Sequence, residues 1–219
     1  MKEPLTEKMK DVAHFDELKP SSNRAATLVL ASSSPRRKEL LGTLGIPFEI
    51  CASDVDESFP EHLAPQDVVE ELAFRKAFEV YKKYRNDPYP RMIIGSDTIV
   101  VLEDAILGKP KNAEEAFAML KRLQGRTHKV YTGVALVDAH SGEKLVAHRM
   151  TAVSMKAMTP SQIKRYVATG EPLDKAGAYA IQGIGATLVE HIEGCYFNVV
   201  GLPLALLSEM LAEFGMEVL

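Results

Sequence analysis

"TLVLASSSPRRKELL", residues 27–41, contains the change of pattern that decides the fold. Residues 27–31 are a short apolar run bounded by serines, as expected for a buried strand. Ser34 suits the N-cap of a helix, and the proline that follows suits its first position. We therefore predict a strand that leads through a tight turn into a helix, which Gly45 ends.

Strand and helix patterns alternate along the rest of the chain. Amphipathic spacing and capping residues predict further helices over 65–84, 112–123, 160–169 and 202–215. A single strand is expected over 47–52, and residues 91–110 are expected to form two strands with a break near Gly95, followed by a hairpin. A pair of strands is expected over 128–155, and a last strand is expected late in 170–194, after a glycine-rich loop. Alternating helices and strands with a hairpin in the middle predict an α/β fold with a mixed sheet.

Composition and charge limit the class of protein. With 219 residues, 46% of them hydrophobic, the chain can bury a sizeable core. We expect one domain over 27–219, and a tail or short helix of no assigned function over 1–26. The formal net charge of −4 argues against nucleic acid or a membrane surface as partners. Residues 1–20 lack the apolar core of a signal peptide, and Cys51 and Cys195 are expected as buried free thiols, so we expect a cytoplasmic protein.

Two arginines lie where the predicted helix begins. The N-terminal end of a helix is its positive end, so Arg36 and Arg37 cost stability there unless an anion meets them. Free backbone N–H groups and the hydroxyls of Ser32 and its two neighbours add donors for such an anion. The alternative is a solvated cap with two surface arginines. The stretch is not a P-loop, because the chain has no GxxxxGK[ST] pattern.

Asp97 interrupts the apolar run "IIGSDTIV" at 93–100. Strand interiors disfavour both Asp and Gly. A carboxylate at this place must be paired, bound to a metal or acting as a base, unless it lies in an exposed bulge.

Other polar residues gain meaning only if the fold brings them together. Lys109 lies between a glycine and a proline that fix its backbone. Lys175 and Gln182 lie in a loop of small residues that permit close approach to a ligand. Glu57 follows the second strand, and Lys76 lies inside the long helix, where a lysine usually extends to solvent. Together with the arginines, these cations and the carboxylates of Asp97 and Glu57 suit a small polyphosphate with Mg²⁺ better than a nucleic-acid strand.

The sequence resembles the Maf family of nucleoside triphosphate pyrophosphatases, from about residue 28 to about residue 214. The resemblance is carried by "ASSSPRRKELL", the "RKA" of 75–77, "GSDTIV", "LGKP", "LKRLQGRTHKVYTGVAL", "GEPLDKAGAYAIQG" and "NVVGLPL". Family members usually have Ala where this chain has Ser96, a mild departure that leaves the carboxylate of Asp97 in place. The extension before residue 27 is also unusual for the family.

The resemblance implies a cytoplasmic α/β protein with a twisted mixed sheet flanked by helices, two lobes with a central cleft as in inosine triphosphatase-like folds, and commonly a homodimer. It also implies hydrolysis of a nucleoside triphosphate to monophosphate and pyrophosphate with a divalent metal, Mg²⁺ or Mn²⁺. Arginine at the position of Arg36 resembles the branch that acts on dTTP and UTP, and a sister branch selective for 7-methyl-GTP has tryptophan there. Implied roles include clearing non-canonical nucleotides and restraining septum formation.

Residue roles follow from the resemblance and from chemistry together. We expect Asp97 to activate water directly or as a metal ligand with Glu57, and Lys76 and Lys109 to hold the phosphates. Substrate binding is expected from Ser32, Arg37 and Lys175, and substrate choice from Arg36, Thr98 and Gln182. The alternatives are the 7-methyl-GTP specificity, a broad activity on modified nucleotides, and a nucleotide-sensing regulator of cell division without turnover.

Overall fold

The structure is a computed structural model that describes residues 26–60 and 62–219, so the predicted tail over 1–26 lies outside it except for its last residue. The strands are β1 (Thr27–Leu30), β2 (Phe48–Ile50), β3 (Arg91–Leu102), β4 (Ala105–Leu107), β5 (Thr127–Asp138), β6 (Lys144–Met155) and β7 (Val189–Glu193). The helices are α1 (Pro35–Gly42), α2 (Pro65–Tyr84), α3 (Ala113–Leu123), α4 (Pro160–Val167), α5 (Tyr196–Val200) and α6 (Leu204–Glu213). Short 3₁₀ segments lie at Glu171–Asp174, Ala176–Ala178 and Gly183–Leu188.

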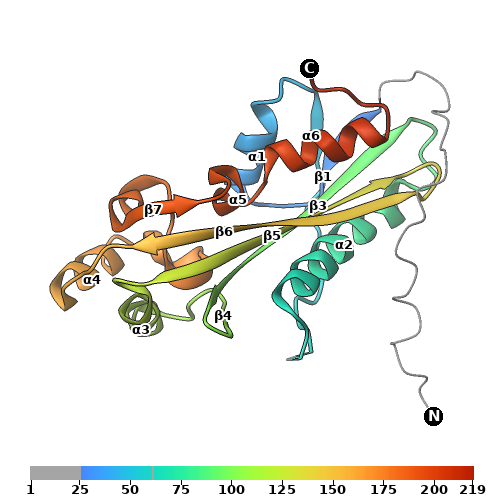
Figure 1. The fold of residues 1–219 in the computed structure, drawn as a ribbon. Coiled ribbons are helices and arrows are strands. Elements are labelled where there is room, and N and C mark those ends of the chain that lie inside the picture. Colours follow the sequence, from blue (N-terminus) through green and yellow to red (C-terminus); the bar gives the residue numbers. More distant parts are fainter. Residues whose placement is uncertain (1–25, 61) are drawn as a thin grey trace, which may run out of the picture.

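One mixed sheet organises the molecule. Its order is β2-β1-β3-β5-β6-β7, and β4 pairs with β3 beside this path. β1 is parallel to both β2 and β3, whereas the β3–β5, β5–β6 and β6–β7 pairs are antiparallel. The predicted α/β fold with a mixed sheet is confirmed (Figure 1).

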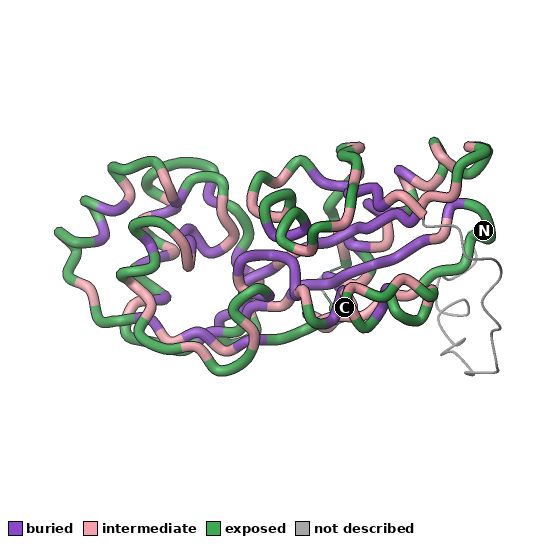
Figure 2. Tube along the Cα trace, turned by 90° about the horizontal axis from the view of Figure 1, so that it is seen from above, coloured by how far each residue is buried: buried purple, intermediate pink, exposed green. Residues whose placement is uncertain are grey.

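Alternate strand residues face different helices, because successive side chains point to opposite faces of a sheet. Leu28 and Leu30 pack with α1 and α6 on one face, whereas Val29 packs with α2 on the other. A separate cluster around α3 and α4 fills the far end of the long strands. The buried parts of the chain run through both ends of the molecule, which confirms two lobes built on a single sheet (Figures 1 and 2).

Predicted caps begin three of the helices. Ser34 caps α1 by accepting a hydrogen bond from the backbone N–H of Arg37, and Asn112 caps α3 in the same way. Thr159 caps α4 and forms a reciprocal capping box with Gln162. α1 ends at Gly42, three residues before the predicted stop, and Gly45 lies in the following turn at a φ of 69°.

The predicted break near Gly95 is wrong. β3 runs unbroken from Arg91 to Leu102 and pairs with β5 throughout this region. The glycine is needed because α2 crosses the sheet there, and a Cβ on Gly95 would lie 2.1 Å from the carbonyl oxygen of Ala73. Gly133 of β5 makes room for the same helix, since its Cβ would lie 2.2 Å from the carbonyl oxygen of Val69.

Two further details differ from the sequence predictions. The short helix α5 was not predicted. Cys51 and Cys195 are free thiols, as expected, but each is half-buried rather than buried. Within the described residues, no helix is both long enough and apolar enough to cross a bilayer.

Candidate active site

A gap along one edge of β3 creates the cleft. β1 stops at Leu30, opposite Ile94, and β4 begins to pair only at Val100. Between them, β3 has neither neighbour on this side within the described residues. A cleft of about 950 Å³ opens at the gap, bordered by α1, α2, the β4 hairpin and the loop over 171–185. Because the edge is open, neighbouring residues of β3 that point to opposite faces can both reach the cleft.

Asp97 lies on the α2 side of this edge and is paired with Lys76. Its Oδ1 lies 2.6 Å from the Lys76 ammonium nitrogen, and both residues are buried. The same nitrogen lies 2.6 Å from Oε1 of Glu57, whose side chain is 54% exposed. The lysine therefore does not extend to solvent, as such lysines usually do, but holds two carboxylates together at the wall of the cleft.

The pKa of Glu57 reflects this arrangement. Partial burial opposes ionisation of its carboxyl, but the hydrogen bond from Lys76 and the positive charges of Lys76, Lys109 and Arg37 outweigh that effect. The pKa of Glu57 consequently lies below its ordinary value. The group is thus ionised at neutral pH and available as a ligand for a cation.

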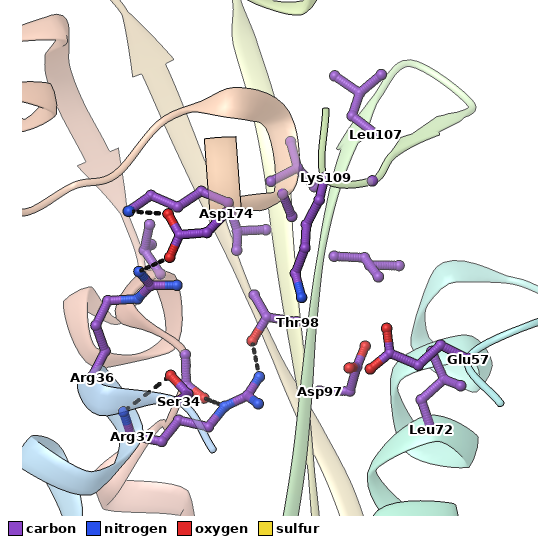
Figure 3. A pocket seen from close by; sticks show the side chains of 18 of the residues that line it. Ser34, Arg36, Arg37, Glu57, Leu72, Asp97, Thr98, Leu107, Lys109 and Asp174 are labelled. Atoms are coloured by element: carbon purple, nitrogen blue, oxygen red, sulfur yellow. Dashed lines mark hydrogen bonds and ion pairs between the residues drawn. The ribbon is translucent and has the colours of Figure 1, made fainter. Parts of the chain in front are cut away.

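Arg37 lies across the cleft, half-buried at the start of α1 (Figure 3). Its Nε donates to the carbonyl of Gly201 at 2.8 Å, Nη1 to Oγ of Ser32 at 3.4 Å, and Nη2 to Oγ1 of Thr98 at 3.1 Å. A guanidinium has five N–H groups, so one on each Nη remains for a ligand. The pKa of Arg37 lies below its ordinary value, chiefly because the side chain is buried. The negative charges of Asp97 and Glu57 raise this pKa, and the positive charge of Arg36 lowers it. No carboxylate lies within ion-pair distance of Arg37 in the part of the chain that the structure describes.

Arg36 points toward the loop over 171–185, where it meets Asp174 (Figure 3). Nη1 of Arg36 lies 3.8 Å from Oδ2 of Asp174, and the side chains are 32% and 70% exposed. Nζ of Lys175 forms an ion pair with the other carboxylate oxygen of Asp174, Oδ1, at 2.6 Å. It also donates a hydrogen bond to the carbonyl of Glu171 at 2.8 Å. Exposed pairs of this kind contribute about 1 kcal/mol or less, so an incoming anion can compete for Arg36.

The remaining predicted residues complete the lining. Lys109 follows β4 and is exposed, and its side chain extends into the cleft (Figure 3). The carbonyl of Gly108 accepts from the backbone N–H of Gly177 at 3.0 Å, which ties the β4 hairpin to the loop that carries Gln182. All ten residues singled out from the sequence line this one cleft: Ser32, Arg36, Arg37, Glu57, Lys76, Asp97, Thr98, Lys109, Lys175 and Gln182.

The charges of the cleft suit an anionic ligand. Five cationic side chains line it against four carboxylates, those of Glu57, Asp97, Asp104 and Asp174, although the whole chain has a formal net charge of −4. An excess of positive charge in the concave part of an acidic protein raises the local concentration of anions.

The donor set for a divalent cation is small. No group of three or more His, Cys, Asp or Glu side chains that could hold a metal occurs in the described residues. Asp97 and Glu57 supply two carboxylates at one place, and among the described residues only Oδ1 of Asp97, not Oδ2, has a hydrogen-bond partner. Mg²⁺ is commonly bound through one or two carboxylates plus substrate phosphates and water, rather than by an all-protein cage. The two residues fit that mode.

Some residues that shape the site were not singled out from the sequence as site residues. Thr132, Gly201 and Asn198 belong to the hydrogen-bond network that holds Arg37 and Thr98. Alternation places Thr132 on the same face of its strand as Val130 and Val134, but sequence alone does not show which residue lies opposite.

One wall of the cleft has an arginine, Arg37, with no carboxylate partner among residues 26–60 and 62–219, and the other wall has two carboxylates. This arrangement defines a class of site, one that binds a phosphorylated ligand. Residues 27–214 match the family described as Maf-like protein, and the chain belongs to that family.

Several curated relatives are similar over nearly their whole length. A protein named dTTP/UTP pyrophosphatase from Moorella thermoacetica is 56% identical over 191 residues, which cover 87% of this chain and 96% of that protein. A protein of the same name from Desulforamulus reducens is 50% identical over 87% of this chain and 98% of its own. The solved nucleoside-triphosphatase / dITP/XTP pyrophosphatase from Mycobacterium abscessus is 20% identical, with a TM-score of 0.37 over 60% of this chain and 75% of that one.

Proposed function

We propose that this protein hydrolyses nucleoside triphosphates, with dTTP and UTP preferred, to the nucleoside monophosphate and pyrophosphate. The observation that carries the proposal is Arg37, a half-buried cation with two unused N–H groups and no carboxylate partner among the described residues. The names of the curated relatives support the reaction and the preferred substrates. Modified pyrimidine nucleotides belong to the same substrate class.

The two walls would divide the work between binding and chemistry. Arg37, Ser32 and Lys175 would bind phosphate oxygens. Asp97 would accept the proton of a water molecule whose oxygen adds to the α-phosphorus, while the bond to the bridging oxygen breaks and pyrophosphate leaves. Lys109, and Lys76 once its contacts rearrange, would stabilise the charge that develops on the departing pyrophosphate.

A divalent cation, Mg²⁺ or Mn²⁺, belongs to this proposal. Asp97 and Glu57 are the residues that would hold it, together with phosphate oxygens. When bound, the cation supplies charge stabilisation at the phosphates and lowers the pKa of a bound water. Asp97 would act either as the general base itself or as a ligand of the cation that activates the water.

Arg36, Thr98 and Gln182 are proposed to select the base. Gln182 carries both a donor and an acceptor, which match a pyrimidine edge that alternates carbonyl and N–H groups. Arginine at position 36 favours the pyrimidine specificity over 7-methyl-GTP. We further propose that residues 27–219 form one domain, that the protein is a homodimer, and that it acts in the cytoplasm.

Product analysis with a panel of triphosphates tests the function. Purified protein with Mg²⁺ or Mn²⁺ is expected to release pyrophosphate from dTTP and UTP faster than from CTP, GTP or 7-methyl-GTP. In ¹⁸O-labelled water the label should enter the monophosphate. Release of orthophosphate would mean cleavage at the γ-phosphate, and nucleotide binding without turnover would favour the regulator.

A further inference from the structure

Thr132 is a buried polar residue directly behind the cleft. It lies in β5, opposite Thr98 in the register of β3 and β5, and has no exposed surface. Its Oγ1 lies 2.9 Å from Oγ1 of Thr98 and 2.8 Å from the carbonyl oxygen of Asn198 in α5. A hydroxyl buried among Val130 and Val134 costs stability unless both its donor and its acceptor are used.

The direction of each proton in this network is determined. A carbonyl oxygen can only accept, so the single hydrogen of Thr132 is donated to Asn198. Oγ1 of Thr132 is then the acceptor toward Thr98, and Thr98 must donate its own hydrogen there. Arg37 in turn donates from Nη2 to Oγ1 of Thr98. All hydrogens therefore point one way, from Arg37 through Thr98 and Thr132 to the carbonyl of Asn198.

The last residue of this hydrogen-bond network, Asn198, is itself held by several hydrogen bonds. Nδ2 of Asn198 donates to the carbonyl of Val130 and to Oγ1 of Thr151, each at 3.0 Å, and Oγ1 of Thr151 also bonds the backbone N–H and carbonyl of Cys195. The helix α5 is thereby fixed on β5 and β6. The carbonyl of Gly201, one residue after α5, accepts hydrogen bonds from Nε of Arg37 and from Oγ of Ser96.

We infer that Thr132 is a positioning residue for the active site, which orients Arg37 and sets Thr98 so that it offers the cleft a lone pair and no hydrogen. The inference rests on the proposed function and deepens it. A ligand group that reaches Thr98 must bring its own hydrogen, as an imino N–H or a hydroxyl does. A carbonyl or an ionised phosphate oxygen is repelled there and directed to the two free N–H groups of Arg37.

Paired substitutions separate positioning from packing. Thr132→Val keeps the shape and removes the hydroxyl, whereas Thr132→Ser keeps the hydroxyl. Both are made in the wild type and with Thr98→Val, and kcat, KM and Tm are measured for UTP hydrolysis. We expect Thr132→Val to lower kcat/KM about tenfold, chiefly through KM, and Thr132→Ser to stay within about threefold of wild type. With Thr98→Val present, Thr132→Val should lower Tm but cause no further loss of kcat/KM, because coupled residues are not additive.

The opposite results would overturn the inference. A purely structural role would be shown if Thr132→Val lowers kcat/KM by the same factor in the wild type and in the Thr98→Val protein. Equal losses of kcat/KM from Thr132→Val and Thr132→Ser would show the same. If Thr132→Val does not fold, Thr132→Cys replaces it under the same criteria, since a thiol has a similar volume but bonds weakly.

The failure of the proposed function would be recognised separately. Wild-type protein that releases pyrophosphate from no triphosphate would refute the function itself. The variants are then compared by calorimetric affinity for a UTP analogue with a methylene bridge between the α- and β-phosphorus atoms. The same pattern of loss, rescue and non-additivity is expected there, and its absence would refute the role of Thr132.

Discussion

Replacing Arg37 by methionine should separate nucleotide binding from folding. Methionine has a similar length and no charge. Three of the five N–H groups of Arg37 bond Ser32, Thr98 and Gly201, and two are left for the ligand. A hydrogen bond to a charged group contributes about 1.5–3 kcal/mol. Because Arg37 is half-buried, the lower value applies, so two bonds give about 3 kcal/mol, or about 10²-fold in kcat/KM.

Stability should change much less than activity. The substitution removes three protein hydrogen bonds but also a cation that burial disfavours, as the lowered pKa of Arg37 shows. We therefore expect Tm to shift by only a few degrees. Arg37→Lys should lose about tenfold in kcat/KM, since lysine keeps the charge without the planar fork.

The assay is pyrophosphate release from UTP over a range of concentrations, with thermal unfolding measured on the same samples. Arg122→Met is the matched control, because it removes an arginine that is exposed on α3 and outside the cleft. A folded Arg37→Met protein with the kcat/KM of that control would refute the assignment of Arg37 as the phosphate-binding residue.

Three further outcomes are expected. Asp97→Asn should lower kcat about 10²-fold or more in a folded protein, and near-normal turnover of UTP would contradict its catalytic role. Gly95→Ala should destabilise by about 3 kcal/mol or more, because its Cβ would lie 2.1 Å from the carbonyl oxygen of Ala73, whereas Gly108→Ala, with nothing within 4 Å, should leave the denaturation midpoint nearly unchanged. The pKa of Glu57 is lowered on folding, so its stabilising effect is present above the unfolded-state pKa and lost as the pH falls through the folded-state value. The Tm difference between wild type and Glu57→Gln should therefore be constant at neutral pH and shrink in acid.

Capping residues and apolar spacing predicted most helices well, because both depend on residues that are close together in the sequence. Caps at Ser34, Asn112 and Thr159 and the stripe along α2 depend on residues within a few positions of each other. The break near Gly95 was predicted wrongly for the same reason. Its low strand propensity is a local fact, but the helix that needs the space lies about twenty residues away in sequence.

The candidate site was predictable as a set of residues but not as an arrangement. Polar residues in apolar surroundings, such as Asp97 and Lys76, indicate that partners exist without showing which ones. That Lys76 joins Asp97 to Glu57, and that Arg36 meets Asp174, depends on how α2 and the loop over 171–185 pack on the sheet. The network behind Thr98 depends on strand register and was not foreseen for that reason.

The continuity of the long strands has a mechanical consequence. β3, β5 and β6 each run for twelve residues, about 40 Å, and pass beneath both lobes without interruption. Domains that close around a ligand by hinge bending need a few residues that absorb large changes of φ and ψ, and a twelve-residue strand paired along its length offers no such joint. The two lobes are thus joined by a continuous, rigid sheet. Nucleotide entry must therefore be accommodated by movements of side chains and of the segments between strands. A covalent tether that joins the lobes away from the cleft would therefore leave turnover largely intact, whereas a tether across the mouth of the cleft, from the start of α1 to the loop over 171–185, would stop it.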